Sequence, residues 1–487
     1  MVRRASHPVA LLSKYLCASE LAASADGSLA IGDLLRAKIE FRKCEVLLLA
    51  GKTQKVVVTG QKLINDFKGF FLPELLGDLY GLLSNAFLML SDYPRMEEAA
   101  LSSIAIQLQA GNTAGIASCR NTLGVMYEDT GRMALALEQY QQALGLYEKL
   151  SDQAGIGGSL VNIGTVLNGL NRAGDSEAAF RRSIDTLEQS IDKVTLGFAY
   201  SNYSVLLARQ GRRDEMMKCL ERSTDIQRQI GDNYGLGFSL SNIAGQQFRS
   251  GQWSRAIMTL NETIAMRESI GERLFLAGNY FELGRLLMEL GRYDEARLKT
   301  ERGITLGNEV SHPDISAAGW LQLAELAHRQ GNHELMRLHL DQAAGCLPAM
   351  AEETRYQLME AYCRLGQGDA AGARQVINRI QQENESLPPK MGAAFFLLKA
   401  QYKCYIDNTD IFNRTDFEQA VISARESAEE GIHVLAGVLF HYGGWLISTG
   451  SEAGQVLSEA EGIFHQLGND FWLEQVAEIR RKSLSGN

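Results

Sequence analysis

The stretch GDNYGLGFSLSNIA, residues 231–244, recurs along this chain at a fixed spacing of 40 residues. Its counterparts are SDQAGIGGSLVNIG at 151–164, IDKVTLGFAYSNYS at 191–204 and GERLFLAGNYFELG at 271–284, and the four align without a gap. An acid recurs near the start of each, at Asp152, Asp192, Asp232 and Glu272. A fixed period of this length indicates a repeat architecture, in which each unit packs against its neighbours.

A turn position follows each of these stretches after seven residues. It is occupied by Asn171, Gly211, Gly251 and Gly291, and Gly131 and Gly331 stand one period before and after them. We call all positions that are equivalent at this spacing the 40-residue lattice. Glycine and asparagine tolerate the left-handed backbone conformation that ends many helices. Apolar residues recur three and four apart beside the turn, as in Tyr140, Leu144 and Tyr147, which is typical of one helical face. Each unit is therefore predicted to be helix, tight turn, helix.

Two stretches carry a more specific pattern. The L-G-x-x-Y-x-x-x-G-x-Y-x-x-A pattern is clear in NTLGVMYEDTGRMALALEQY (Asn121–Tyr140) and in NYFELGRLLMELGRYDEA (Asn279–Ala296), where Met133 and Leu287 each replace one tyrosine. With this pattern the chain resembles the tetratricopeptide repeat (TPR) family, in the long-repeat form of kinesin light chain, of LGN/Pins-type adaptors and of bacterial TPR regulators. The resemblance is strong over 71–345 and weaker over 31–70. It implies an all-α, right-handed α-solenoid of about ten to eleven helix pairs.

The lattice breaks after Cys346. The next candidate turn glycine is Gly366, 35 residues after Gly331, and residues 406–416 read as a polar loop. We therefore predict an N-terminal helical cap over 1–30, a regular array over 31–345 in which 31–70 is degenerate, and irregular helix pairs with a C-terminal cap over 346–487. A cap is expected because the last repeat of a solenoid would otherwise expose an apolar face.

Charge and cysteine usage exclude several classes of protein. The net charge of −10 argues against broad nucleic-acid binding, which needs a basic surface. The seven cysteines contain no CxxC pair, which is neither a disulfide framework nor a zinc spacing and favours the cytoplasm. Lys14 and Glu20 interrupt the apolar patch near the start of the chain, so export is not predicted. No run approaches the roughly 20 apolar residues of a membrane span.

Three stretches imitate chemical motifs. Gly51-Lys52-Thr53 resembles the end of a phosphate-binding loop, but Val46 stands where that motif needs its first glycine. Gly51 also falls on the turn lattice, which predicts a helix–helix turn. In GIGGSLVNIG (155–164), Leu160 replaces the third glycine of a dinucleotide loop. The histidines at 328, 333 and 339 lack a metal-ligand spacing. We therefore predict no catalytic residue, no cofactor and no metal.

Partner binding is expected instead in the concave groove that the first helices line in TPR proteins. The resemblance places two sets of residues there. The residue two before the small L-G glycine reads Thr122, Asn162, Asn202, Asn242, Glu282 and Gln322, and the residue two before the turn reads Asp129, Arg209, Arg249, Glu289 and Arg329. Arg285, one turn earlier on its helix, should point the same way. An asparagine row can bond the backbone of an extended peptide, and arginines bind carboxylates. The same asparagines are also the commonest TPR residue at that place and could bond between repeats.

The candidate contacts are therefore Asn162, Asn202, Asn242, Gln322, Arg209, Arg249, Arg285 and Arg329. We predict a non-enzymatic scaffold or adaptor whose partner is an extended or helical, partly acidic peptide or protein segment. The alternative is a signalling sensor that binds a short peptide and changes superhelical pitch, since small rotations per repeat add up. The sequence leaves homo-oligomerisation open, because an uncapped terminal helix pair can stack on a second copy.

Overall fold

The computed structural model of the chain describes residues 31–49, 52–66, 73–90, 92–310, 312–383, 387–407, 412–428 and 431–484. Within these ranges the chain is all-α, with one 3₁₀ helix and no strand. The α-helices follow one another as eleven consecutive pairs and a last single helix. The predicted all-α solenoid of helix pairs is confirmed. The chain divides into two compact units, Met1–Leu236 and Gly237–Asn487, here called unit 1 and unit 2.

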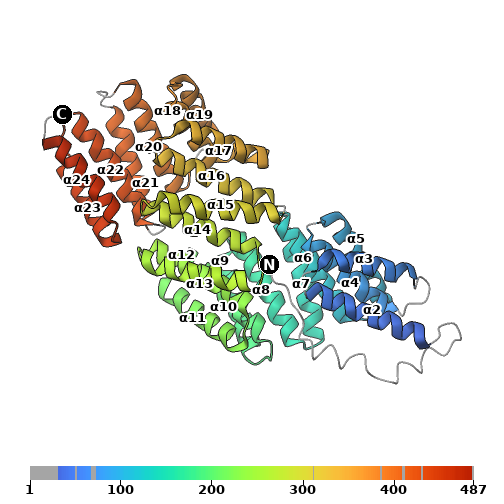
Figure 1. Cartoon of the computed structure of the whole chain (residues 1–487). Coiled ribbons are helices and arrows are strands. Elements are labelled where there is room, and N and C mark those ends of the chain that lie inside the picture. The colour runs from blue at the N-terminus through green and yellow to red at the C-terminus, as the bar shows by residue number, and fades with distance from the viewer. Residues whose placement is uncertain are drawn as a thin grey trace. The chain divides into compact units, whose positions relative to one another are not determined.

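Unit 1 contains five helix pairs, which Figure 1 shows in blue to green. They are α2 (Ile31–Leu49) with α3 (Thr53–Asp66), α4 (Pro73–Met89) with α5 (Tyr93–Ala110), α6 (Thr113–Asp129) with α7 (Met133–Lys149), α8 (Gln153–Gly169) with α9 (Ala173–Glu188), and α10 (Lys193–Arg209) with α11 (Arg213–Ile230). The unit boundary falls inside α12 (Asn233–Arg249). Even-numbered helices are the first helices of their pairs.

Unit 2 continues the pairing to the end of the described chain. Its helices after α12 are α13 (Trp253–Ser269), α14 (Leu274–Glu289), α15 (Tyr293–Glu309), α16 (Pro313–Arg329), α17 (His333–Cys346), the 3₁₀ helix η1 (Pro348–Glu352), α18 (Thr354–Gly366), α19 (Ala370–Glu383), α20 (Pro389–Ile406), α21 (Phe412–Glu426), α22 (Ile432–Ser448), α23 (Gly454–Leu467) and α24 (Asp470–Leu484). None of the described helices is both long and apolar enough to cross a membrane.

The turn between the helices of a pair has the predicted left-handed conformation. The lattice glycines have φ values of 69 to 78°, and Asn171 has a φ of 58°. The residue after the turn donates its backbone N–H to the carbonyl five residues earlier, as from Arg212 to Leu207 at 3.0 Å. This bond closes the first helix as a Schellman motif. The left-handed residue and the residue after it therefore end the first helix and reverse the direction of the chain.

The recurring acids begin the first helices. A side-chain oxygen of Asp152, Asp192 and Asp232 accepts the backbone N–H three residues later, each at 3.0 Å. Glu272 does the same for Phe275 at 3.0 Å. A carboxylate at this position satisfies one of the unpaired N–H groups and interacts well with the helix dipole. The lattice acid is therefore a helix cap.

Small lattice residues join the two helices of a pair in unit 1. The hydroxyls of Ser103, Ser183 and Ser223 donate to the carbonyls of Gly77, Gly157 and Gly197, at 2.7, 2.8 and 2.7 Å. These serines are buried, so each hydroxyl needs a partner. The bond requires close contact between helices, because a Cβ at residue 157 would lie 2.4 Å from Leu187. Small residues on both helices thus set their separation.

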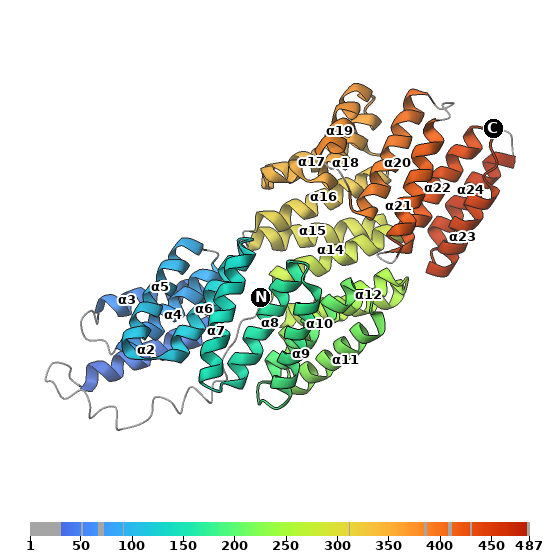
Figure 2. The same cartoon turned by 180° about the vertical axis from the view of Figure 1, so that it is seen from behind.

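The last helices of unit 2, α22 to α24, contact its first helices, α12, α14 and α15. Asn469, between α23 and α24, donates its side-chain amide to the carbonyl of Glu289 at 2.9 Å. The Phe471 ring meets the Tyr293 ring edge-on at 5.7 Å. His433 at the start of α22 lies 5.0 Å from the Phe248 ring of α12. Figure 2 shows the red C-terminal helices near the end of α14. The two ends of unit 2 are therefore joined by contacts between residues that lie far apart in the sequence.

The turn predicted at Gly366 lies two residues later. Gly366 is the last residue of α18, and the left-handed residue is Gly368 with a φ of 84°. A Cβ on Gly366 would lie 2.2 Å from the His333 ring. The sequence prediction was wrong because Gly366 is small for packing against α17, and Gly368 reverses the chain.

The polar loop predicted over 406–416 is shorter than expected, since α21 begins at Phe412. Its polar side chains hold the helix to α20. Asp416 lies 2.7 Å from the Lys403 amine, and the Asn413 side chain donates to the carbonyl of Asp407 at 2.8 Å. These residues were read as loop formers, but they make contacts between helices.

Two predictions fall on residues outside the described ranges. Residues 1–30, predicted as a helical cap, are not described, and neither is Gly51. Helix α2 ends at Leu49 and α3 begins at Thr53, so helices flank the stretch that imitated a phosphate loop. The 3₁₀ helix η1 follows α17 where the lattice breaks. The division into cap, regular array and irregular array stays a prediction.

Candidate functional site

The two predicted amides of unit 1 lie on neighbouring first helices. Asn162 is on α8 and Asn202 on α10, and these helices contact each other. Both side chains are half-buried, and neither makes a hydrogen bond with any other residue that the structure describes. Val205, one turn after Asn202, is 42% exposed. The α8–α10 face thus offers two amides with donors and acceptors available beside an apolar contact.

Arg209 lies at the end of α10, beside the turn of the preceding repeat. Its Nη1 donates to the carbonyl and the side-chain oxygen of Asn168, at 2.8 and 2.9 Å. Its Nη2 donates to Asn171 Oδ1 at 2.8 Å. The side chain is exposed, and these three bonds use three of the five donors of a guanidinium. The arginine is oriented by the turn and keeps donors for a carboxylate.

The equivalent arginine of unit 2 has a different environment. Arg329 on α16 makes a two-pronged ion pair with Glu289 on α14, at 2.6 and 3.1 Å. Arg355 on α18 donates to Glu325 on α16 at 2.6 Å, and Glu325 lies 3.7 Å from Arg329. We call Glu289, Arg329, Glu325 and Arg355 the charged row. It links three successive first helices with alternating charge.

The charges of this row are fixed by one another. Burial acts to raise the pKa of Glu325, but Arg355 and Arg329 outweigh it and lower the pKa to about 2. Burial also acts to raise the pKa of Glu289, and Arg329 holds that pKa below its ordinary value. Charge-assisted, two-pronged bonds of this kind are strong and directional. The row therefore holds helices together and has little charge left for a partner.

Of the other residues of unit 2 that were predicted to contact a partner, some pack inside the fold and others lie at the surface. Gln322 is buried on α16, and its amide donates to the Phe281 carbonyl and to Thr300 Oγ1, both at 3.0 Å. The Arg285 guanidinium lies 4.9 Å from the Phe248 ring centre. Arg249 is exposed and donates to Gln246 at 3.3 Å, and Asn242 is half-buried. Gln322 thus links three helices of the fold.

Sequence profiles described as tetratricopeptide repeat match residues 116–153, 195–269 and 277–298. These ranges contain part of the caps, turns and small residues described above, among them Asp152, Gly211 and Ser223. The chain contains tetratricopeptide repeats over these ranges. No curated protein matches the sequence.

Solved structures share the fold at low identity. A Rap protein complexed with Competence and Sporulation Factor is 13% identical with a TM-score of 0.50, over 76% of this chain and 99% of that one. A signal transduction ATPase (STAND) protein with a tetratricopeptide repeat sensor from Pyrococcus horikoshii is 14% identical with a TM-score of 0.52, over 74% of this chain and 54% of that one. The apo form of the quorum sensor NprR from B. thuringiensis is 13% identical with a TM-score of 0.49, over 71% and 98%.

The sequence analysis did not predict the ion pairs of the charged row. Glu289 was placed in the groove set without its bond to Arg329, and Glu325 and Arg355 were not singled out. The signal was present, because Glu289 and Arg329 lie 40 residues apart at the same lattice position. Opposite charges at one position of adjacent repeats predict a pair. Asn168 and Asn171, which orient Arg209, follow from no spacing rule.

Two of the three histidines singled out in the sequence lie against different aromatic rings. The His328 ring is tilted against the Tyr362 ring at 4.4 Å between ring centres, and the His339 ring stacks on the Trp320 ring at 5.4 Å. No group of histidine, cysteine or carboxylate side chains within the described ranges could hold a metal ion. Burial lowers the pKa of His328 to about 4, so the ring is neutral at pH 7.

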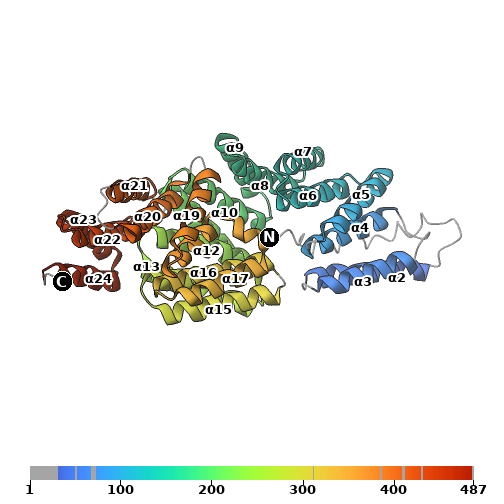
Figure 3. The same cartoon turned by 90° about the horizontal axis from the view of Figure 1, so that it is seen from above.

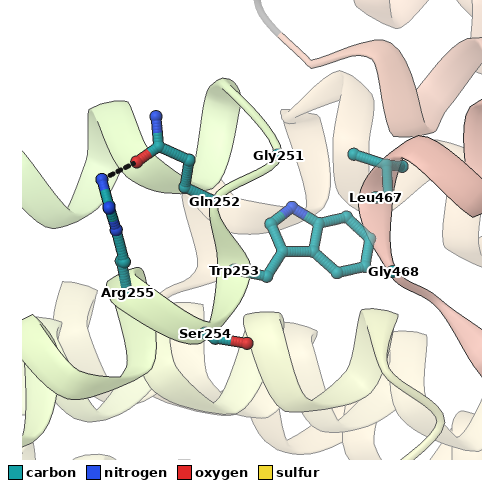
Figure 4. A pocket seen from close by; sticks show the side chains of 7 residues that line it. All are labelled: Gly251, Gln252, Trp253, Ser254, Arg255, Leu467 and Gly468. Atoms are coloured by element: carbon teal, nitrogen blue, oxygen red, sulfur yellow. Dashed lines mark hydrogen bonds between the residues drawn. The ribbon is translucent and has the colours of Figure 1, made fainter.

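A shallow hollow of about 430 Å³ lies where the 251–255 turn meets Leu467 and Gly468. Figure 4 shows Trp253 facing these two residues, with Arg255 bonded to Gln252 at 3.1 Å. The indole N–H already donates to the Phe248 carbonyl at 3.1 Å. Its lining has no acid, histidine or cysteine. The hollow is a packing junction of the TPR array, and we assign no ligand to it.

Proposed function

We propose that this chain is a non-enzymatic TPR scaffold that binds an extended peptide or protein segment across α8 and α10. The observation that carries the proposal is the pair of half-buried amides, Asn162 and Asn202, without a partner among the described residues. Amides that are partly removed from water need partners. Each can donate to a peptide carbonyl and accept a peptide N–H, and this pairing does not depend on peptide sequence.

Arg209 supplies the preference for a partly acidic partner. The Asn168 and Asn171 bonds fix its direction at the end of α10, and its remaining donors can bind one carboxylate. Asn242, Arg249 and Arg285 are the equivalent candidates of unit 2, and we propose them as a separate set. Gln322 and Arg329 are left out because their bonds to α14 and α15 occupy them.

A second candidate function is a peptide-responsive sensor. Two proteins of similar fold support this candidate. One is a Rap protein complexed with Competence and Sporulation Factor, and the other is an ATPase whose repeats are described as a sensor. A sensor changes superhelical shape on binding, since repeat arrays transmit small rotations along their length. Small-angle scattering separates the two, because a scaffold keeps its radius of gyration when peptide binds and a sensor does not. We place the chain in the cytoplasm on its cysteine usage.

Selection from a random peptide library against the immobilised full chain tests the proposal. Selected peptides should bind the wild-type chain, and Asn162→Ala combined with Asn202→Ala should weaken binding on the order of tenfold to thirtyfold, for two hydrogen bonds of about 1 kcal/mol each. Asn261→Ala is the matched control, since Asn261 is an exposed asparagine on the second helix α13. Equal affinities for the double variant and the wild type would overturn the α8–α10 site.

A further inference from the structure

The residue of α14 at the lattice position of Asn162 and Asn202 is a carboxylate, Glu282. Its side chain is half-buried, and its Oε2 atom is buried and accepts no hydrogen bond from any described residue. Glu282 also makes no ion pair with a residue that the structure describes. A carboxylate that is removed from water needs a cation or N–H donors. Glu282 therefore lacks the partner that its burial requires.

Asn279, one turn before Glu282, has a second acceptor without a donor. Asn279 is 4% exposed, and its amide nitrogen donates to Ser241 Oγ on α12 at 2.9 Å. Its Oδ1 atom accepts no hydrogen bond in the described part of the chain. Figure 3 shows α12 and α16, which precede and follow α14 among the first helices of unit 2. Since residues three apart lie on one side of a helix, the two buried acceptors lie on the same side of α14.

Burial acts most strongly on the Glu282 carboxyl. It raises the pKa of this group, although the charges of Arg285, Arg249 and Arg267 act to lower that pKa. Arg267 is already paired with Glu272 at 2.7 Å. An opposite charge in direct contact would instead hold the pKa of a carboxyl below its ordinary value. The nearby guanidinium groups thus do not replace the water that Glu282 has lost.

Arg285 supplies donors one turn after Glu282. Its guanidinium lies 4.9 Å from the Phe248 ring centre and donates to no other described residue. Glu282 and Arg285 are three residues apart, so both lie on the same side of α14. Their charged atoms nevertheless stay more than 4.0 Å apart. This turn of α14 therefore presents an acceptor group and a donor group that do not bond each other.

We propose that this turn of α14 binds the free N-terminus of a partner peptide. The α-ammonium group donates to the Glu282 carboxylate and to Asn279 Oδ1, and the carbonyl of the first peptide residue accepts from Arg285. A peptide N-terminus carries both groups within one residue, whereas a lysine ammonium stands on a four-carbon stem without a neighbouring carbonyl. This inference rests on the proposed function and specifies the ligand of its unit 2 set.

Selection from synthetic peptide libraries against the immobilised full chain tests this site. The chain carries Asn162→Ala and Asn202→Ala, so that α8 and α10 do not contribute. Lysine-free peptides with a free N-terminus should yield binders, and the same library with acetylated N-termini should not. Acetylation of a selected peptide should weaken its binding at least about thirtyfold, because the loss of one member of a buried charge pair is costly.

Glu282→Gln should weaken binding of the selected peptide by a similar factor, because the amide keeps the shape of the side chain and loses its charge. Glu334→Gln is the matched control, since Glu334 is exposed on the second helix α17, and should leave the affinity unchanged. Glu282→Gln should also keep or raise the melting temperature, because it removes a buried charge that has no partner in the fold.

Several outcomes overturn the proposal. Equal enrichment from the acetylated library, no enrichment from either library, or full affinity in Glu282→Gln would mean that no peptide N-terminus binds here. Binders from an acetylated library that contains lysine, with affinity lost in Glu282→Gln, would assign the carboxylate to a lysine side chain. A lower melting temperature of Glu282→Gln would show that this carboxylate holds the fold. The selection with the wild-type chain tests α8 and α10 separately, so either site can fail without the other.

Discussion

Asn202 on α10 and Gln322 on α16 occupy the same lattice position three repeats apart, and their environments differ. Asn202 is half-buried and bonds no other residue in the described part of the chain. Gln322 is buried and bonded to two neighbouring helices. Arg209 and Arg329 show the same contrast, since one is exposed at a turn and the other is paired with a carboxylate on the preceding first helix. A repeat position therefore does not determine whether its residue binds a partner or holds the fold.

The residue 40 positions earlier makes the difference for the arginines. Arg329 has Glu289 there, and the two form an ion pair. Arg209 has Gly169 there, so its guanidinium reaches Asn168 and Asn171 instead. An arginine that has a carboxylate at the equivalent position of the preceding repeat thus links the two repeats, whereas an arginine without one stays at the surface.

Acid should unfold unit 2 before unit 1. Burial lowers the pKa values of His328 and His433 to about 4. A neutral histidine with a depressed pKa contributes stability that is full above about 6.5 and is lost as pH falls through about 4, with a slope of up to about 1.4 kcal/mol per pH unit for each group. Glu325, with a pKa of about 2, adds a further loss only below about 4.5. The sequence of unit 1 has one histidine, His7, so this source of acid instability belongs to unit 2.

Tryptophan fluorescence measures this difference, because Trp253, Trp320, Trp445 and Trp472 all belong to unit 2. Between pH 7 and 4, the fluorescence should change at higher pH than the far-UV circular dichroism, which reports both units. Coincident transitions would show that acid does not distinguish the units. His328→Gln with His433→Gln should move the fluorescence transition to lower pH.

Removal of one member of the charged row should cost more than removal of a surface pair. Arg329→Ala leaves the Glu289 carboxylate, 13% exposed, without its main partner, and should lower the free energy of unfolding by about 3 kcal/mol. Arg182→Ala in unit 1 breaks an exposed pair with Glu148 at 2.6 Å and should cost at most about 0.5 kcal/mol. Urea unfolding followed by circular dichroism gives both values. Equal losses would mean that the row is no stronger than a surface pair.

Glycine turns should differ between the units as well. Gly131 and Gly291 have φ values of 74° and 72°, so alanine at either position costs about 1–2 kcal/mol in backbone energy. A Cβ on Gly291 would also lie 2.4 Å from the Phe471 ring, whereas at Gly131 nothing lies within 4 Å. Gly291→Ala should therefore destabilise the chain by about 1 kcal/mol more than Gly131→Ala. Equal melting temperatures for the two variants would argue against the contact between α24 and this turn.

The two amides at the same lattice position should also differ in their effect on stability. Gln322→Ala removes two buried hydrogen bonds and should lower the free energy of unfolding by about 1–2 kcal/mol. Asn202→Ala removes none within the described ranges and should stay within about 0.5 kcal/mol of wild type. Urea titrations of the two variants give the comparison, and an unstable Asn202→Ala would reveal a structural role for this amide.

The sequence predicted the parts of the fold that repeat. Helix pairs, left-handed turns and small contact residues follow from local rules of backbone conformation and packing, and they appear at the same place in each repeat. Gly366 was misassigned because two glycines stand close together and only packing against His333 distinguishes them. The fold-back of Asn469 onto Glu289 spans 180 residues, and no local rule encodes a contact at that separation. The candidate amides were named, but their bonding state depends on neighbours that sequence order does not reveal.

The central claim is that the α8–α10 amides bind a partner, while the equivalent amide of α16, Gln322, holds the fold. Hydrogen–deuterium exchange of the full chain, with and without a library-selected peptide, tests it most directly. Peptide should slow exchange in α8 and α10 by tenfold or more and leave α16 unchanged, and Asn162→Ala with Asn202→Ala should abolish that protection. Protection confined to α16 and its neighbours, or protection of α8 and α10 that persists in the double variant, would contradict the account.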